Sequence, residues 1–401
     1  MTLPAFKSPN TFQRTMLAWE SFAPYNAAQF ATLAAPTSLN RAALESAWKK
    51  VFDEQQLERF GQKSRELIRA SNSIFSHITS ELNHRFAEDE SPFRPFILEE
   101  NGRTHVGIVY RHAVADSVSI RLLMQAWITQ ESPGKIDINY RDRWIGITQR
   151  CRESYAEVGW FRRMTRARRL PKTVDVRDSV TWSQHEFPDG LIDRLVAHCR
   201  ARNVKMNDLF VVTAARVGAR FVPFESHGGR TDAAVGTIVD LRQPKKPLNF
   251  GLALGFMHTF FTADEFADRD RALKVASHTS RGARSRGVDA ATQLRLRIAL
   301  WYHRRFSLED LTDFYRKRCP LVAGMSNVNL NRTPLGDWCV QQNAIYTRVS
   351  PLGPMLPLVF TPTTIGSKMT LGLTTRDGLF DATKRTQIMD AFVDELNEIA
   401  R

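Results

Sequence analysis

The sequence predicts a mixed α/β (α+β) protein that is built from two lobes. Its 401 residues exceed what one ordinary hydrophobic core accommodates. Segments with the alternation of strands and segments with the periodicity of amphipathic helices follow one another along the whole chain. Hydrophobic residues make up 43% and charged residues 24%, which is normal for a globular domain. We expect the lobes to span residues 1–170 and 171–401.

The first part of the chain alternates between predicted helices and strands. Residues 10–20 indicate a short helix and residues 24–35 a strand. A second helix opens at Leu39 or Asn40, with its apolar residues on one face. Residues 71–86 (SNSIFSHITSELNHRF) are interpreted as a strand. Residues 91–112 predict a strand pair whose turn contains Asn101 and Gly102.

The stretch from Thr104 to Trp127 begins as a strand and ends as a helix. Alternating apolar residues precede His112, and apolar residues at helical spacing follow Ser117, which we expect to be the N-cap. His112 and Asp116 lie between the two elements. A strand end that opens into a helix commonly presents reactive groups, because the scaffold fixes them while the loop exposes them.

Residues 131–178 lose regular periodicity and are interpreted as the linker between the lobes. Their basic segment, FRRMTRARRLPK, predicts a solvated helix, with contact to phosphate or to a membrane surface as the alternative. The second lobe starts near Ser179 with a strand. A helix over 188–202 follows, then a helix from Met206 that is capped by Asn207 or Asp208, and a strand over 231–244.

The rest of the second lobe predicts further strands around a basic helical region. Residues 249–261 and 321–330 indicate strands, and residues 266–317 indicate helices. Residues 337–375 predict a run of strands, and a closing amphipathic helix follows Asp381. We expect His258, which lies among apolar residues, to be packed in the core.

Charge and cysteine usage limit the partners. Lysine and arginine number 56 against 42 acidic residues, a net charge of +14 that attracts anionic partners. No nucleic-acid-binding module is recognisable, so nucleic acid is not an expected partner. The four scattered cysteines predict neither a disulfide framework nor a metal site, and indicate a reducing, cytoplasmic location. No signal peptide or membrane-spanning run is predicted.

The sequence HAVAD, from His112 to Asp116, resembles the HxxxD signature of the condensation-domain and chloramphenicol acetyltransferase-like superfamily. This superfamily includes BAHD acyltransferases, wax ester synthases and alcohol O-acyltransferases. The second half is similar in its Val239-Asp240-Leu241-Arg242 strand and its Ser326-Asn327 strand. The resemblance implies two chloramphenicol acetyltransferase-like lobes, each a mixed sheet flanked by helices, with the active-site channel between them.

The resemblance also implies an activity, namely acyl transfer from a thioester to a hydroxyl or amine of a small-molecule acceptor. The donor would be acyl-CoA or an acyl carrier protein with its phosphopantetheine arm, as co-substrate and without a further cofactor. We expect a monomer. His112 would be the general base, since the pKa of imidazole lies near neutrality. Asp116 would pair with Arg242 and orient the histidine loop.

Three further residues are candidate oxyanion donors or channel residues: Ser117, Ser326 and Asn327. Backbone N–H groups from Ala115 to Ser117 are the alternative oxyanion donors. Carrier-dependent condensation domains usually show HHxxxDG, and here Arg111 and Ser117 replace the first His and the Gly. Two other functions stay open. The chain could be a catalytically silent condensation-like protein that binds a carrier or partner, or a basic nucleic-acid-binding protein.

Overall fold

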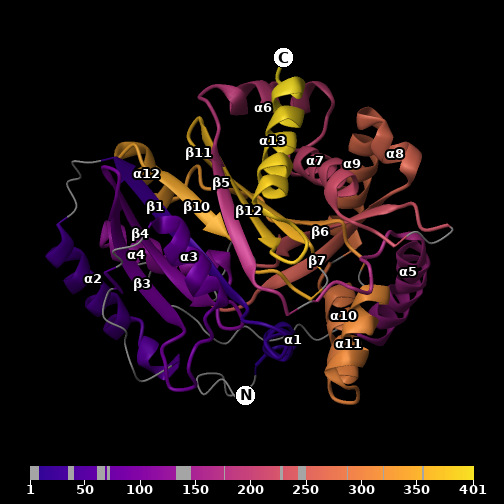
Figure 1. Ribbon diagram of the computed structural model, residues 1–401, viewed down its shortest axis with the longest axis horizontal. Helices are drawn as coiled ribbons and strands as arrows, with labels where there is room; N and C mark the ends of the chain where they lie inside the picture. The colour runs from indigo at the N-terminus through magenta and orange to yellow at the C-terminus, as the bar shows by residue number, and fades with distance from the viewer. Residues whose placement is uncertain are drawn as a thin grey trace.

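The computed structural model describes residues 9–34, 40–60, 68–69, 73–131, 146–175, 177–225, 229–242, 250–286, 288–318, 320–354 and 356–401. These residues form two mixed sheets with helices packed on them (Figure 1). The predicted mixed α/β class with two lobes is therefore confirmed. Within the described chain, no helix combines the length and the apolar character needed to cross a membrane.

The first sheet contains five strands, in the order β10 (Ile345–Val349), β1 (Asn26–Ala34), β4 (Arg103–Arg111), β3 (Phe93–Glu100) and β2 (Ile68–Arg69). The helices of the first half of the chain are α1 (Thr11–Trp19), α2 (Arg41–Glu54), α3 (Ile74–Asn83), α4 (Ser117–Thr129) and α5 (Ile147–Arg166). A short 3₁₀ helix spans Leu57–Phe60. The hairpin predicted between β3 and β4 is confirmed: Asn101 and Gly102 both have positive φ, as a two-residue turn of this type requires.

The second sheet contains β5 (Val180–Glu186), β12 (Lys368–Arg376), β11 (Leu358–Ile365), β8 (Ala323–Met325), β6 (Ala233–Asp240) and β7 (Leu254–Phe261), while β9 (Val328–Asn329) pairs with β11. Its helices are α6 (Leu191–Ala201), α7 (Met206–Phe221), α8 (Ala263–Ala267), α9 (Arg269–Arg286), α10 (Val288–His303), α11 (Leu308–Arg318), α12 (Pro334–Gln341) and α13 (Ala382–Ile399).

Strand β10 belongs to the first sheet although it lies late in the sequence. It pairs antiparallel with β1, so that Gln29 faces Arg348 (Figure 1 shows orange β10 among the indigo and purple strands). The second sheet contacts β10 through side chains: Thr361 Oγ1 donates to the Arg348 carbonyl oxygen at 2.6 Å, and Thr370 Oγ1 donates to that of Tyr346 at 2.8 Å. Gly372 permits this approach, because a Cβ there would lie 2.4 Å from the Arg348 carbonyl oxygen. The division of the chain at residue 170 remains a prediction.

Besides the cap of α4, which is described below, three predicted elements were wrong in type or in their caps. Residues 73–83 form the cap and body of α3 and no strand, because Ser73 caps the helix and its apolar residues recur every four positions against the sheet; Ser71 and Asn72 lie outside the described residues. Thr333 and Pro334 start helix α12 where strands were predicted. Helix α7 begins at Met206 with Lys205 at the N-cap position, so neither Asn207 nor Asp208 is the cap.

The basic residues in the last turns of α5 are exposed as predicted, but the two arginines that follow the helix are half-buried. The helix ends at Arg166, and the residues after it pack onto the second sheet and its helices. Arg169 forms an ion pair of 2.5 Å with Glu225, and Arg168 donates to the carbonyl oxygens of Thr231 and Ala219. These two arginines therefore fasten the chain to the second half of the molecule.

Candidate active site

His112 lies directly after β4, in the turn that leads into α4. Its backbone N–H donates to the Tyr25 carbonyl oxygen at 3.0 Å. The imidazole stacks on the Tyr25 ring, with centroids 5.7 Å apart and planes inclined by 9°, and the Tyr110 ring meets it edge-on. The side chains of Tyr25, which directly precedes β1, and of Tyr110, on β4, therefore fix the plane of the imidazole.

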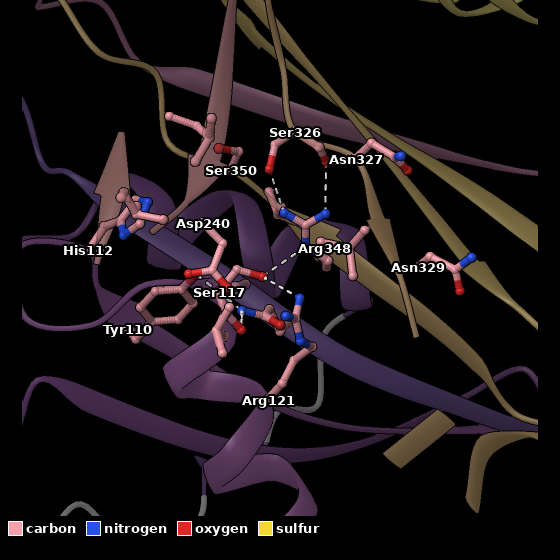
Figure 2. Close-up of a pocket in the computed structure, with 17 residues that line it drawn as sticks. Tyr110, His112, Ser117, Arg121, Asp240, Ser326, Asn327, Asn329, Arg348 and Ser350 are labelled. Atoms are coloured by element: carbon pink, nitrogen blue, oxygen red, sulfur yellow. Dashed lines mark hydrogen bonds between the residues drawn. The ribbon is translucent and has the colours of Figure 1, made fainter. Parts of the chain in front are cut away.

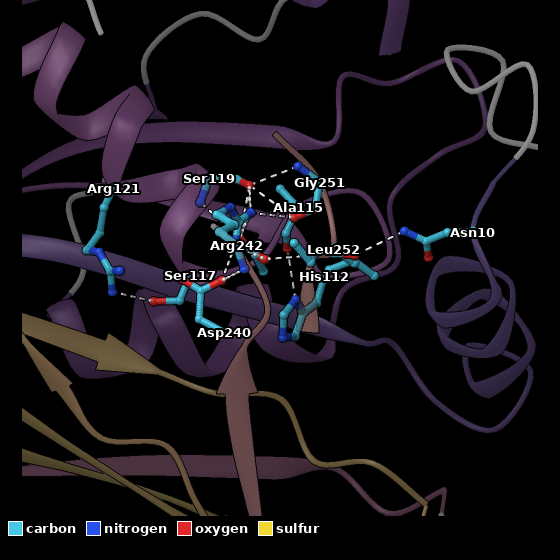
Figure 3. Close-up of polar contacts among 12 residues, drawn as sticks. Asn10, His112, Ala115, Ser117, Ser119, Arg121, Asp240, Arg242, Gly251 and Leu252 are labelled. Atoms are coloured by element: carbon cyan, nitrogen blue, oxygen red, sulfur yellow. Dashed lines mark hydrogen bonds and ion pairs between the residues drawn. The ribbon is translucent and has the colours of Figure 1, made fainter. Parts of the chain in front are cut away.

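One hydrogen bond decides which nitrogen of His112 is available. Nδ1 lies 2.9 Å from the Ala115 carbonyl oxygen, which can only accept, so Nδ1 carries the hydrogen (Figure 3). Burial lowers the pKa of the imidazole, against the opposing effects of the Ala115 carbonyl and the Asp116 carboxylate. The neutral ring then presents the lone pair of Nε2, to which no residue of the described chain hydrogen-bonds.

Asp116 is the N-cap of α4 and is completely buried. Ser117, predicted as the cap, is instead the first helical residue: the Asp116 carboxylate accepts from the Ser119 backbone N–H at 2.9 Å, which Ser117 does not do. Asp116 also forms a two-pronged ion pair with Arg242, whose Nη1 and Nη2 lie 2.8 and 2.9 Å from Oδ2 and Oδ1. The structure thus brings the two residues together as predicted, whereas their orienting role remains a proposal.

The same carboxylate links the motif to the segment after β6. The Ala253 N–H donates to Asp116 Oδ2 at 3.2 Å, and the Gly251 N–H donates to Ser119 Oγ at 2.9 Å (Figure 3). Burial alone would raise the pKa of the Asp116 carboxyl, but Arg242 and the backbone N–H groups of Ser119 and Ala253 lower it below its usual value. We call this group of Asp116, Ser119, Arg242 and Gly251 the latch. It joins a turn of the first half of the chain to a loop of the second half.

Two cavities meet at His112. The first, here called the polar cavity, has a volume of about 270 Å³ and is lined by both sheets. Its polar lining comes from Gln29, Tyr110, Ser117, Arg121, Asp240, Ser326, Asn327, Asn329, Arg348 and Ser350 (Figure 2). Ser117, Ser326 and Asn327, the predicted oxyanion or channel residues, all lie here.

The arginines dominate the polar cavity. Arg348 Nε donates to Ser117 Oγ at 3.0 Å, and its two Nη atoms donate to the carbonyl oxygen and to Oγ of Ser326 at 2.8 and 2.7 Å (Figure 2). Arg121 Nη1 donates to Ser117 Oγ at 3.3 Å. The Ser117 side chain, which replaces the glycine of the HHxxxDG form, therefore lies against two guanidinium groups. Asn327 Oδ1 is buried and has no partner in the described part of the chain.

The second cavity, here called the apolar cavity, has a volume of about 150 Å³ and shares His112, Ile238, Leu254, Ser326 and Ser350 with the first. Aliphatic and aromatic side chains form most of its wall, among them Met16, Trp19, Phe256, Leu296, Leu321 and Leu356. The imidazole and the Ser326 hydroxyl therefore lie at the boundary of a polar and an apolar compartment.

His258 also lines the apolar cavity and is not the packed core residue that the sequence predicted. Its Nδ1 accepts from Trp160 Nε1 at 3.1 Å and lies 3.0 Å from Arg295 Nη1. Burial, followed by the nearby Arg295 charge, lowers the pKa of this histidine far below its ordinary value. Because two donors already contact Nδ1, we expect His258 to shape the cavity and not to accept a substrate proton. Among the described residues, no cluster of His, Cys, Asp and Glu could hold a metal ion.

Sequence reasoning missed Arg121, Arg348 and the latch residues Ser119 and Gly251. A signal existed for both arginines, since each interrupts an apolar element: Arg121 in SIRLLMQAW and Arg348 in IYTRV. The pattern gives no sign that they share a cavity, because 226 positions separate them and β10 must first join the other sheet. Gly251 adopts φ 117°, a conformation that favours glycine, but this is visible only in the folded chain.

In comparisons of sequence, no family model and no curated protein matches the chain. Solved structures do match. The TRI3 trichothecene 15-O-acetyltransferase from Fusarium sporotrichioides has a TM-score of 0.68 at 9% identity, covering 98% of this chain and 94% of that one.

Two further matches come from peptide synthetases. The starter condensation domain of rhizomide synthetase RzmA gives a TM-score of 0.64 at 13% identity, over 98% of this chain and 94% of that one. The EpoB cyclization-docking bidomain from Sorangium cellulosum gives 0.63 at 12% identity, over 99% of this chain and 85% of that one. At such identities the likeness establishes the fold alone: the chain has the same two-lobed fold as these condensation-type domains and this acetyltransferase, which is the fold that the resemblance of the HAVAD segment led us to expect.

Proposed function

We propose that the protein is an acyltransferase that moves an acyl group from a thioester to a hydroxyl or amine, with His112 as general base. One observation carries the proposal: the Ala115 carbonyl fixes the hydrogen on Nδ1 and leaves Nε2 with a lone pair, in a ring that lines two cavities of different character. A neutral imidazole in this state accepts a proton at neutral pH. The solved structures with this fold include an acetyltransferase and condensation domains, which supports acyl transfer in general.

The reaction proceeds in two proton transfers around one tetrahedral intermediate. Nε2 of His112 removes the proton of the acceptor while the acceptor oxygen or nitrogen forms a bond to the thioester carbonyl carbon. The carbon–sulfur bond then breaks, and the imidazolium returns the proton to the departing thiolate. No acyl-enzyme forms and no further reagent is needed. Holding both substrates in place contributes up to about 7–11 kcal/mol to lowering the barrier.

The walls of the two cavities support separate places for the reaction partners. The apolar cavity suits an acyl chain, because its aliphatic and aromatic lining stabilises buried hydrocarbon. The acceptor would occupy the polar cavity. Ser326 lies at the boundary; its Oγ accepts from Arg348, which leaves its hydroxyl hydrogen to be donated to the oxyanion.

Asp116 and Arg242 orient the base in this proposal and do not react. The carboxylate is saturated by Arg242, Ser119 and Ala253, so it has no capacity to accept a substrate proton. Its effect on His112 passes through the turn, since Ala115, whose carbonyl binds Nδ1, directly precedes Asp116. The donor is acyl-CoA or an acyl carrier protein, and the net charge of +14 suits either anionic partner.

The test is thiol release from a panel of acyl-CoAs, and from acylated carrier protein, in the presence of mixed hydroxyl and amine acceptors. We expect His112→Gln, which keeps the side-chain volume, to lower kcat by about 10²–10⁴-fold while leaving the unfolding transition in place. His185→Gln is the matched control, since His185 is a half-buried histidine of β5 that lines neither cavity. If His112→Gln retains the wild-type rate, His112 is not the general base.

A further inference from the structure

The polar cavity contains two guanidinium groups that no carboxylate of the described chain pairs with. Arg348, on β10, is only 5% exposed, and Arg121, on α4, is half-buried. The two acidic residues near them are already engaged: Asp116 and Asp240 both form ion pairs with Arg242, at 2.8 and 3.1 Å. Two cations thus face the cavity with neutral hydrogen-bond partners alone.

The hydrogen bonds of these arginines leave donors to spare. A guanidinium has five N–H donors. Arg348 directs one each to Ser117 Oγ, the Ser326 carbonyl oxygen and Ser326 Oγ, and the described residues offer Arg121 a single acceptor, Ser117 Oγ at 3.3 Å. A charge this deeply buried is costly unless it is compensated. Burial and the neighbouring Arg121 lower the pKa of Arg348 to about 10, so Arg348 stays protonated near neutrality. Burial also lowers the pKa of Arg121.

The small size of the cavity limits which anion can meet these arginines. Arg121, Arg348 and His112 line one space of about 270 Å³, so an anion bound there lies close to the reacting atoms. The phosphates of coenzyme A do not meet this condition, because the whole pantetheine arm separates them from the thioester. The anionic group therefore belongs to the molecule that is held beside the imidazole. Planar guanidinium groups bind planar carboxylates through two parallel hydrogen bonds.

We propose that the acceptor is a small carboxylic acid that also carries the reacting hydroxyl or amine, a hydroxy acid or an amino acid. Arg348 and Arg121 bind its carboxylate while its hydroxyl or amine faces Nε2 of His112. Asn327 and Asn329 line the same cavity and offer neutral contacts to the rest of the molecule. This assignment rests on the proposed acyl transfer, since it names the substrate of that site.

The experiment measures binding separately from turnover. The full chain is titrated in a calorimeter with a panel of hydroxy acids and amino acids, each paired with its primary amide. The amide keeps the shape and removes the charge. We expect the bound acids to lose about 10- to 100-fold in affinity as amides. The same pairs are then assayed as acceptors by thiol release from acyl-CoA and from acylated carrier protein.

Two variants and one control locate the effect. Arg348→Gln and Arg121→Gln should each reduce the preference for acid over amide several-fold; Arg121→Gln tests the idea even if loss of the Ser326 bonds unfolds Arg348→Gln. Arg202→Gln should leave the preference unchanged, because Arg202 is the exposed C-cap residue of α6 and pairs with Asp270.

The outcomes separate the two proposals. If the acids bind more tightly than their amides but no thiol is released, the carboxylate site is supported and the proposed acyl transfer is refuted. Two results would overturn the carboxylate site and leave the proposed acyl transfer standing. One is a turnover rate that is the same for each acid and its amide, and the other is a panel of acids that bind no more tightly than their amides. Adenosine 3′,5′-bisphosphate is the phosphate probe: binding that depends on Arg348 and Arg121, in the absence of acid binding, would assign these arginines to the donor and overturn the proposal.

Discussion

The two cavities on either side of His112 differ in how they can discriminate between ligands. The apolar cavity is lined largely by side chains from the second half of the chain and from α1, and it binds by burying hydrocarbon. The polar cavity is lined by the motif itself and by β10, and it presents charge. Burial of one additional methylene changes the binding free energy little, whereas an unpaired charge changes it greatly. We therefore expect tolerance toward the acyl group and selectivity toward the acceptor.

The largest effect on stability and activity should come from the latch, which fixes the turn that carries His112. Asp116→Asn replaces the buried carboxylate partner of Arg242 with a neutral amide and leaves only the exposed Asp240 carboxylate as its counter-charge, so we expect the free energy of unfolding to fall by up to about 3–5 kcal/mol. Activity should fall with every acyl donor and every acceptor alike, because the turn that fixes His112 is common to both cavities. Urea denaturation and thiol release measure the two effects.

The control for the latch is Asp175→Asn, which breaks an ion pair between two exposed side chains, Asp175 and Arg177. A much smaller loss of stability is expected there, since solvent screens such pairs. An Asp116→Asn variant as stable and as active as the wild type would show that the carboxylate does not orient the histidine turn.

A medium effect confined to one cavity is expected from Gly353→Val. Gly353 lines the apolar cavity, and a Cβ there would meet only ordinary contacts at 3.6–3.7 Å with Tyr25, Leu356 and Trp19. The added methyl groups occupy space that an acyl chain would fill. We expect the ratio of kcat/KM for long over short acyl-CoAs to fall by roughly 10- to 200-fold.

The acid-to-amide preference of the acceptor should stay unchanged in Gly353→Val, because the polar cavity does not include this residue. Gly159→Val, whose new side chain meets open space on α5, is the matched glycine control. If chain-length selectivity stays as in the wild type, the acyl group does not bind in the apolar cavity.

The smallest effect is the dependence of kcat/KM on pH, which we expect to follow the titration of the His112 imidazole alone. Burial lowers the pKa of His112 below 6.5, so Nε2 is unprotonated at neutral pH and kcat/KM should be flat there. Below the lowered pKa, kcat/KM should decrease about tenfold per pH unit. Arg348 stays charged throughout this range and contributes no acidic limb.

Stability provides an independent check on the same group. Between the lowered pKa of folded His112 and its ordinary value of 6.5, the unfolded chain binds more protons than the native one. The contribution of neutral His112 to the free energy of unfolding is therefore fully present above pH 6.5 and decreases as the pH falls toward the pKa of the folded state. A kcat/KM profile whose acidic limb survives in His112→Gln would assign the titration to another group.

The sequence predicted the elements whose residues are close together. The Asn101–Gly102 hairpin and the Thr104–Trp127 strand-to-helix segment depend on local turn chemistry and on periodicity, and both are present in the structure. The misassigned α3 shows the limit of that approach. Its serine cap and four-residue spacing were visible, but a short segment with mixed polar residues fits both periodicities until it packs on a sheet.

The sequence alone determined that an imidazole and a carboxylate share one turn, since only five residues, His112 to Asp116, lie between the strand and the helix. It also identified Arg242 as a partner for Asp116, although only through the resemblance. The tertiary structure decided that the Arg348 guanidinium lies in the polar cavity. Arg348 lines the same cavity as His112 only because β10 leaves the second half of the chain and pairs with β1. A crossover of that kind depends on contacts between distant residues, which no local sequence pattern records.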